Sequence, residues 1–282
     1  MSHPAVGSRQ MRCGQRDDST ISDSTISDEH EGQHMQIAVA GGTGLLGRLV
    51  VAAAADAGHT TVVLSRSTGT DLMTGSGLTA ALQGSAAVID VSNISTLSAK
   101  KSINFFATTT GNLLEAGRQA GVAHHIAVSI VGVDRVDYGY YLGKRRQEEL
   151  LLAGDRPATV LRATQFHEFA QQLLDRFPGP VALVPAMLSQ PIAAREVAQA
   201  LVALVGDAPG GLVPELAGPE ELEMTDMVRR VLRSQGSRRR VLKLRLPGAV
   251  GRQMATGGLL PTGPGPRGTQ TFQDWLATSG MP

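Results

Sequence analysis

The sequence has little of several features that mark particular classes of protein. Its single cysteine, Cys13, excludes an internal disulfide and any cage of cysteines around a metal ion. Lysine and arginine number 26 against 25 aspartates and glutamates, so the net charge of +1 gives no overall attraction to nucleic acid or to an anionic membrane. No uninterrupted apolar run reaches the roughly 18 residues of a membrane-spanning helix, and the first residues lack the apolar core of a secretory signal. We therefore expect a cytoplasmic protein without nucleic-acid or membrane partners.

Histidine gives no metal site either. His124 and His125 are adjacent, and neighbouring residues of a strand point to opposite faces, so the pair cannot hold one ion. We expect no bound metal.

Residues 1–34 are rich in Ser, Asp, Gln and His. They contain a tandem repeat, in which 19–23 and 24–28 both read Ser-Thr-Ile-Ser-Asp. Such a segment buries too little apolar area to offset the entropy lost on ordering. We predict a disordered N-terminal tail over 1–34 and a folded part that begins at Met35.

From Met35 onward, short apolar runs alternate with stretches of helical length. The first run, 36–40, is almost wholly apolar and ends at glycines, as expected of a strand buried on both faces of a parallel sheet. We predict strands over 36–40, 60–64, 86–91, 125–129 and 159–162, and helices over 45–57, 78–82, 103–120 and 141–153. This alternation predicts an α/β fold with a doubly wound parallel sheet.

The first predicted strand runs into Gly41-Gly42-Thr43-Gly44-Leu45-Leu46-Gly47, and a predicted helix follows at once. The spacing satisfies both G-x-x-G-x-x-G and G-x-G-x-x-G. The first glycine would make the tight exit from the strand, the middle one would let backbone N–H groups approach a pyrophosphate, and Gly47 would let helix and sheet pack closely. The pattern predicts a dinucleotide-binding turn with contacts from Gly41, Thr43, Gly44, Leu45, Leu46 and Gly47.

The end of the second predicted strand indicates which dinucleotide is bound. An acidic residue there would accept from a ribose 2′-hydroxyl, but the chain has Ser65 and Arg66 instead. A hydroxyl and a guanidinium favour a 2′-phosphate, so we expect NADP(H) rather than NAD(H). Arg66 could also be an ordinary surface cation. Asp71 would lie near the adenine at a short third strand, although an acidic turn residue explains it almost as well.

Beyond Thr164 the pattern loosens, and prolines punctuate short segments. Helices are still predicted over 194–205 and 225–233, a strand over 241–244, and a short terminal helix carrying Phe272, Trp275 and Leu276. We therefore divide the folded part into a dinucleotide-binding core over 35–164 and a smaller C-terminal region over 165–282 on the substrate side, which completes the same domain.

The three tyrosines, at 138, 140 and 141, fall within four positions. Tyr140 and Lys144 lie on one face of a helix, where the ammonium would lower the phenol's pKa and leave it to exchange a proton with a carbonyl or alcohol. Ser129, at the end of a predicted strand, would orient the same substrate oxygen. Alternatively, Lys144 could pair with Glu148 on a solvated face, the tyrosines could be packing residues, and Ser129 could cap a strand.

The register of the phenol is also open, because Tyr141 faces Arg145 at the same spacing. Either tyrosine could therefore be the active one.

Taken with 110–116 and 127–129, the glycine turn and Tyr140 to Lys144 resemble the short-chain dehydrogenase/reductase superfamily. Residues 161–166 and 271–276 resemble its atypical, NmrA-like NAD(P)-binding branch. The resemblance implies a Rossmann core, and a catalytic set of Ser129, Tyr140 and Lys144. It further implies a nicotinamide side lined by Val91, Ser92 and Asn93, and a substrate side that includes Gln165, Phe166 and His167. His167 could instead be a packed or solvated side chain.

The spacing from Ser129 to Tyr140 is shorter than in better known members, and some NmrA-like relatives sense redox state without turning over a substrate. We expect an NADPH-dependent oxidoreductase that acts on a small carbonyl, enone or quinone with Tyr140 as proton donor. The alternative is an NAD(P)H-binding, redox-sensing regulatory protein. The sequence leaves the oligomeric state open.

Overall fold

The computed structural model describes residues 34–153 and 157–278. The tail predicted over 1–34 therefore lies outside the described residues, apart from His34. The described residues belong to one compact unit.

A six-stranded parallel sheet forms the centre of this unit. Its strands are β1 (Gln36–Ala40), β2 (Thr60–Leu64), β3 (Ala87–Asp90), β4 (His124–Ile130), β5 (Ala158–Ala163) and β8 (Gly211–Leu212). Their order is β2-β1-β3-β4-β5-β8, so the chain leaves β1 first to one side and then to the other. The predicted doubly wound parallel sheet is confirmed.

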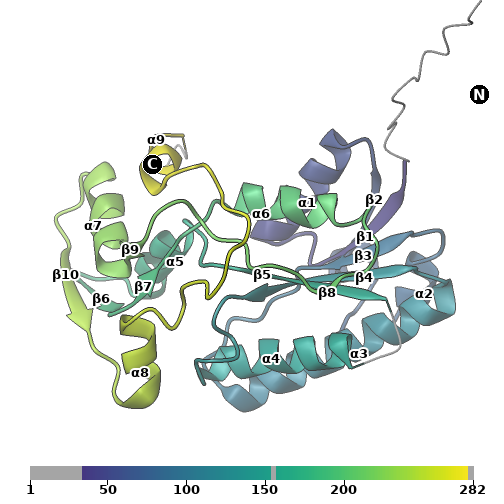
Figure 1. Cartoon of the computed structure of the whole chain (residues 1–282), viewed down its shortest axis with the longest axis horizontal. Coiled ribbons are helices and arrows are strands. Elements are labelled where there is room, and N and C mark those ends of the chain that lie inside the picture. Colours follow the sequence, from purple (N-terminus) through teal and green to yellow (C-terminus); the bar gives the residue numbers. More distant parts are fainter. Residues whose placement is uncertain (1–33, 154–156, 279–282) are drawn as a thin grey trace, which may run out of the picture. The chain divides into compact units, whose positions relative to one another are not determined.

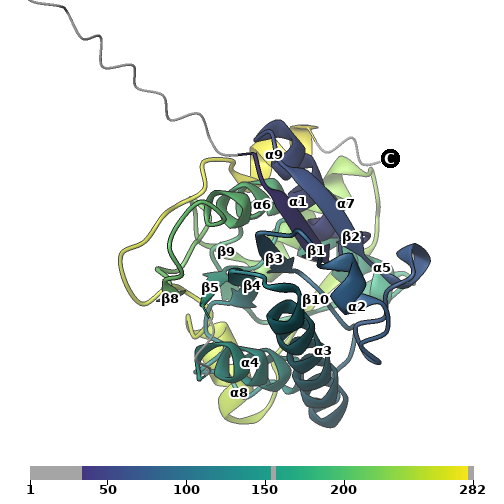
Figure 2. The same cartoon turned by 90° about the vertical axis from the view of Figure 1, so that its right-hand side faces the viewer.

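Helices cover both faces of this sheet. Figure 2 shows α1 (Leu45–Asp56) and α6 (Ala194–Ala203) on one face, and α3 (Ala99–Ala120) and α4 (Gly139–Leu152) on the other. Alternation along the strands explains the two layers, because Val39 packs towards α1 and α6, whereas Ala38 packs towards α3 and the short α2 (Leu78–Ala81). α3 begins four residues before the predicted start, where Ser98 caps it by accepting from the Lys101 N–H.

Helices α3 and α4 approach each other very closely. A Cβ added to Gly143 would lie 2.1 Å from the Ser102 Oγ, and that hydroxyl donates to the Tyr140 carbonyl over 2.9 Å. The start of α4 is therefore fixed against α3.

The short third strand expected at Asp71 does not form. Residues 66–68 make a 3₁₀ turn, η1 (Arg66–Thr68), and the Asp71 carboxylate accepts from the Met73 and Thr74 N–H groups. These hydrogen bonds from the Asp71 side chain hold the backbone in a turn. The segment therefore does not make the backbone hydrogen bonds to a neighbouring strand that a β-strand would need. With no strand at Asp71, the strand that ends before Val91 is the third in the chain. It would have been the fourth if the strand at Asp71 had formed.

The region beyond Thr164 builds a second apolar cluster next to the sheet (Figure 1). Its elements are α5 (Phe169–Arg176), β6 (Val181–Pro185), β7 (Leu188–Ser189), β9 (Leu222–Glu223), α7 (Met224–Ser234), β10 (Arg240–Leu244), α8 (Gly248–Ala255) and α9 (Phe272–Thr278). β6 pairs with β10 in parallel, and β7 pairs with β9 in antiparallel. β8 and α6 come from the same region of the chain but complete the main sheet and its cover.

Within the residues described, no helix combines the length and the apolar character needed to cross a membrane.

Candidate functional site

The glycine turn joins β1 to α1 in the predicted strand-turn-helix arrangement. Gly41 has a φ of +80°, and a Cβ at this position would lie 2.8 Å from the Ser92 Cα. A Cβ on Gly47 would lie 2.1 Å from the Gly41 carbonyl oxygen. The Gly41 N–H donates to the Leu64 carbonyl over 3.3 Å. Glycine is thus required where the carboxyl ends of β1, β2 and β3 meet.

This turn presents an anion-binding helix start. The N–H groups of Leu45, Leu46 and Gly47 have no carbonyl four residues earlier within α1, and no acidic side chain lies in the first turn. Arg48 donates to the Thr43 carbonyl over 2.8 Å, which places a cation beside the turn. Sequence reasoning did not single out Arg48, although a cation directly after Gly47 was a visible signal. The backbone cradle fits a diphosphate.

The end of β2 leaves one cation available. Ser65 Oγ lies 2.8 Å from Ser67 Oγ within η1. Arg66 is exposed, and its guanidinium makes no hydrogen bond or ion pair with the part of the chain that the structure describes. Because Leu64 bonds to Gly41, both residues follow a strand end that adjoins the glycine turn.

The end of β3 connects the glycine turn to α4. The Val91 N–H donates to the Ala40 carbonyl, and the Ser92 N–H donates to Asp90 Oδ1 over 2.9 Å. Asn93 Oδ1 accepts from the Tyr140 hydroxyl over 2.7 Å. The structure therefore brings Val91 to Asn93 and Tyr140 to one edge of the sheet.

Lys144 is buried between α4 and the sheet, one turn after Tyr140. Its Nζ donates to the Val128 carbonyl over 3.0 Å and to Gln147 Oε1 over 2.9 Å, and it lies 4.5 Å from the centre of the Phe106 ring. Burial lowers the pKa of Lys144 to about 8, partly opposed by the carboxylates of Asp90 and Glu148. The solvated pairing with Glu148 is wrong, because Lys144 is buried.

The phenol of Tyr140 does not behave as expected from the Y-x-x-x-K spacing. Burial, with Tyr141 and Asp90 nearby, raises its pKa above the ordinary value. The expected lowering by Lys144 is absent because the ammonium bonds to Val128 and Gln147 instead. Tyr140 is consequently a neutral donor at ordinary pH.

Tyr141 occupies a different environment. It is buried, its hydroxyl lies 3.5 Å from Gln165 Nε2, and burial raises its pKa to about 12. Arg145 does not face it, because that guanidinium donates to the Val133 carbonyl and to Asp137. Of the two candidate phenols, Tyr140 is the one at the edge that carries the glycine turn.

Two serine hydroxyls at this edge are buried without a hydrogen-bond partner among the described residues. They belong to Ser92 and Ser129. Ala127 packs against Leu114 of α3 and Leu151 of α4, so alternation places Ser129 on the face of β4 that carries Lys144. Buried hydroxyls normally find partners, and these two are available to a ligand.

The residues predicted on the substrate side follow β5 and lie in different environments. Gln165 Oε1 also lacks a described partner, and Phe166 packs partly against the core between the sheet and α6. His167 is fully buried: its Nε2 lies 3.1 Å from the Gln270 carbonyl, and its ring contacts Phe272 and Trp275. His167 therefore packs against the C-terminal segment, which favours the packed alternative over a contact with substrate.

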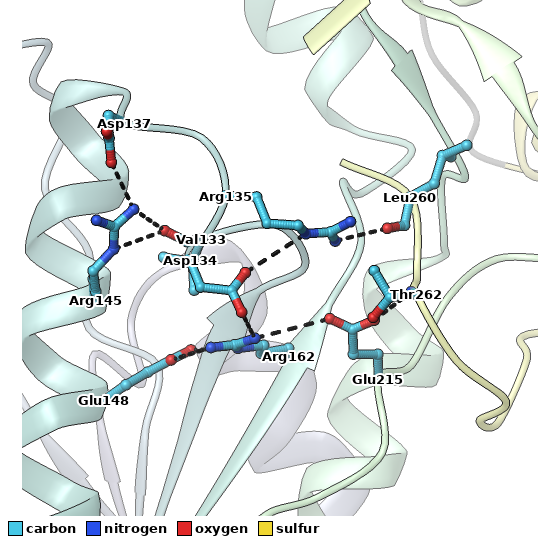
Figure 3. A network of polar contacts seen from close by, with 10 residues as sticks. All are labelled: Val133, Asp134, Arg135, Asp137, Arg145, Glu148, Arg162, Glu215, Leu260 and Thr262. Carbon is cyan, nitrogen blue, oxygen red and sulfur yellow. Dashed lines mark hydrogen bonds and ion pairs between the residues drawn. The ribbon is translucent and has the colours of Figure 1, made fainter. Parts of the chain in front are cut away.

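A charged network that sequence reasoning missed lies behind this edge (Figure 3). Arg162 of β5 binds both carboxylate oxygens of Glu148 at 2.9 and 2.6 Å, and Asp134 at 2.8 Å. Its Nη1 also lies 4.0 Å from Glu215, which accepts from the Thr262 N–H. The partners are far apart in sequence, so only the buried charge at Arg162 within a strand could have signalled them.

Within the described residues, no group of three or more His, Cys, Asp or Glu side chains is arranged to hold a metal ion.

No protein-family model and no curated protein sequence matches the chain. Solved structures do. The NADPH-dependent quinone oxidoreductase of Escherichia coli, complexed with NADPH, has a TM-score of 0.65 at 19% identity, over 86% of this chain and 98% of that one. RMD of Pseudomonas aeruginosa, complexed with NADPH, gives 0.64 at 15%, and UDP-glucose-4-epimerase of Stenotrophomonas maltophila, with bound NAD, gives 0.63 at 17%; each match covers 86% of this chain and 96% of the other.

The chain has a Rossmann fold. The Rossmann core that the resemblance implies is thereby confirmed, whereas the short-chain dehydrogenase/reductase superfamily and its NmrA-like branch stay predictions. In Rossmann proteins, ligands bind outside the carboxyl ends of the strands, where the strand order reverses. In this chain that position is the edge formed by the glycine turn, Ser92 and Tyr140.

Proposed function

We propose that the chain is an NADPH-dependent oxidoreductase that transfers hydride between the nicotinamide and a small carbonyl, enone or quinone. One observation carries the proposal. The Tyr140 hydroxyl, 2.7 Å from Asn93 Oδ1, lies at the same strand end whose Ser92 backbone closes on Gly41. A proton donor thus adjoins a turn shaped for a dinucleotide. We place this activity in the cytoplasm, because cysteine usage favours a reducing compartment.

The cofactor preference rests on the end of β2. Among the described residues, the Arg66 guanidinium has no partner and no carboxylate follows β2 directly in the place of a ribose ligand. Arg48 adds a second cation beside the glycine turn. The similar structures support a nicotinamide cofactor, since two are complexed with NADPH and one with NAD.

The proposed roles follow from the contacts. When bound, the cofactor supplies the hydride. Residues 41–47 hold its diphosphate, and Arg66 with Ser65 holds the 2′-phosphate. The Ser92 and Ser129 hydroxyls, which lack described partners, donate to polar groups at the reacting end. Tyr140, kept protonated by its raised pKa, gives its proton to the substrate oxygen, and Lys144 anchors the phenol's helix to β4 through Val128.

The decisive experiment is Tyr140→Phe, with Tyr138→Phe as the matched control. NADPH oxidation would be followed with a panel of quinones, enones and carbonyls. We expect kcat to fall by about 100-fold or more in Tyr140→Phe, with NADPH affinity unchanged by calorimetry, while Tyr138→Phe keeps its turnover. Equal turnover in all three proteins would remove Tyr140 from the mechanism.

Cofactor choice is tested separately at Arg66. Arg66→Asp should weaken NADPH binding by about 10-fold or more and leave NADH binding little changed, because only the former has the 2′-phosphate. Lys101→Asp, an exposed charge change on α3, is the control. Unchanged selectivity would refute the assignment.

A second candidate is a redox-sensing protein that binds NADP(H) without turnover. The observation that favours it is the Lys144 ammonium, which bonds to Val128 and Gln147 and leaves the Tyr140 pKa raised. This candidate predicts tight cofactor binding and no oxidation with any acceptor. Sustained oxidation of NADPH by several carbonyls or quinones would exclude it.

A further inference from the structure

Positive charge is concentrated in one part of the chain. Between Met227 and Gln273 the sequence has no aspartate or glutamate, although the whole chain is almost neutral. The same stretch holds ten cations: Arg229, Arg230, Arg233, Arg238, Arg239, Arg240, Lys243, Arg245, Arg252 and Arg267. A local field of one sign on a balanced chain indicates an anionic partner for this region.

Next to these cations, the two-stranded sheet of β6 and β10 exposes an apolar face. In the parallel register Leu242 neighbours Leu183, and these side chains are 53% and 47% exposed. Val181 and Leu244 are exposed on the same face, whereas the alternate residues of β6 are buried against the second apolar cluster. One side of this small sheet is therefore packed and the other is open.

β10 also has an open backbone edge. Arg240 donates to the Pro180 carbonyl and Leu244 accepts from the Ala186 N–H, so the even-numbered residues of β10 pair with β6. The N–H and C=O groups of Val241 and Lys243 point the other way, and they make no hydrogen bond with the described residues. Figure 1 shows β10 at the margin of the molecule, beyond β6.

Two of the cations beside this edge, Arg240 and Arg245, have side chains that are available to a partner. Arg240 and Arg245 are exposed and have no partner in the described part of the chain, whereas Arg239 is held by the Leu174 and Phe177 carbonyls. Lys243 contacts Glu223. Charged residues on an edge strand serve by themselves to prevent aggregation. Here all are of one sign and they accompany an apolar face, which is the pattern of a binding edge.

From this edge we infer that the chain binds an acidic, extended peptide segment of a partner protein, which adds as a further strand to β10. Main-chain groups of the peptide would pair with Val241 and Lys243. Because side chains alternate, its apolar residues would neighbour Leu242 and Leu244, and its carboxylates would neighbour Lys243 and Arg245. This surface lies outside the proposed oxidoreductase site and does not depend on it.

Other occupants fit less well. A membrane would leave the open backbone groups without partners in an apolar phase. A second copy of β10 would set like charges against each other. Single-stranded nucleic acid needs aromatic stacking, and β10 has no aromatic residue.

The test uses the full chain and a fluorescein-labelled short peptide of alternating glutamate and valine, followed by fluorescence anisotropy. We expect binding that weakens with salt, and none for the same peptide with lysine in place of glutamate or with N-methylated alternate backbone nitrogens. Vesicles of phosphatidylserine and phosphatidylcholine are measured in parallel. Binding to the vesicles without binding to the peptide would overturn the proposal, and so would equal binding of the acidic and basic peptides.

Variants separate strand addition from simple charge attraction. Lys243→Pro removes an outward N–H, and Lys243→Ala keeps it while losing the same charge; we expect the proline variant to bind about 10-fold more weakly than the alanine variant. Arg245→Glu should weaken binding by a similar factor, and Arg195→Glu on α6 should not. Equal affinities within either pair would contradict the proposal. Arg245→Glu remains decisive if the proline variant fails to fold.

Discussion

At the scale of single residues, the glycine turn depends on a very close approach between its own backbone segments. Gly47 has the Gly41 carbonyl and the Gly42 Cα where a Cβ would stand, at 2.1 and 2.6 Å. No rotamer change relieves such a contact, because both neighbours are backbone atoms. The start of α1, where we propose that the diphosphate binds, can lie this close to the turn only because residue 47 has no side chain.

Gly47→Ala should therefore displace the first turn of α1 and weaken NADPH binding by about 10-fold or more. Gly111→Ala on α3 is the control, since a Cβ there meets nothing within 4 Å and alanine favours a helix by up to about 1 kcal/mol. Isothermal calorimetry and thermal unfolding measure the two effects. Wild-type affinity in Gly47→Ala would mean that the turn does not hold the diphosphate.

At the scale of elements, polar contacts from several residues along α4 hold this helix in place. Lys144 binds the Val128 carbonyl of β4. Glu148 binds Arg162 on β5, and Arg145 binds the Val133 carbonyl in the loop before the helix (Figure 3). Hydrogen bonds to both oxygens of Glu148 make its pairing bidentate and buried. The helix that carries Tyr140 is consequently fixed in rotation as well as in position.

Glu148→Gln should lower the free energy of unfolding by about 3 kcal/mol, because it leaves the buried Arg162 without its main counter-charge. Glu149→Gln, on the neighbouring residue, removes only the exposed pair with Arg146 and should cost less than about 1 kcal/mol. Urea unfolding measures both. Equal losses would show that burial does not decide the strength of these pairs.

At the scale of the whole molecule, the C-terminal segment is fastened back onto the core. Glu196 of α6 accepts from the Thr269 and Gln270 N–H groups at 2.6 and 3.1 Å. His167, after β5, meets the Gln270 carbonyl and the rings of Phe272 and Trp275. The C-terminal segment and the core around the parallel sheet therefore belong to one folded unit.

The burial of His167 gives this junction a pH dependence. Burial lowers the pKa of His167, opposed by the Gln270 carbonyl and by Glu196 and Glu220. A base with a lowered folded pKa takes up a proton more readily when unfolded, so its neutral packing is fully stabilising above the unfolded value of about 6.5 and stability falls as the pH drops below it.

We expect the urea midpoint, read from the single tryptophan Trp275, to fall between about pH 6.5 and 5 more steeply in the wild type than in His167→Gln. The variant should be less stable than the wild type at pH 7, because it loses the ring contacts. Parallel curves for the two proteins would remove His167 as the group responsible.

Much of the central sheet could be predicted, because its strands are apolar runs of strand length closed by glycine or polar residues. β1 and β2 form over the predicted residues, and α1 ends one residue short of the prediction. The segments 181–185 and 248–255 were missed, since prolines and glycines within and beside them hid their periodicity. The helix over 169–176 was missed because its eight residues make little more than two turns. The strand expected at Asp71 failed because its carboxylate satisfies a turn.

The site was predictable only where the pattern is local. The glycine turn and the Y-x-x-x-K spacing depend on neighbouring residues, and the structure sets both at one edge. The direction of the Tyr140 pKa was not predictable, because it depends on where Lys144 finds acceptors, and Val128 lies on another element. The surroundings of Arg162 depend in the same way on contacts distant in sequence.

The closeness of α3 and α4 carries a consequence for descent. A Cβ on Gly143 would meet the Ser102 hydroxyl at 2.1 Å and the Ser102 backbone carbonyl group at 2.7 Å. A lineage that gained a methyl group at 143 could not make room by shrinking residue 102 alone. It would have to move α3 away from α4 and lose the hydrogen bond to the Tyr140 carbonyl, so glycine should be inherited at 143 wherever the two helices pack in this way.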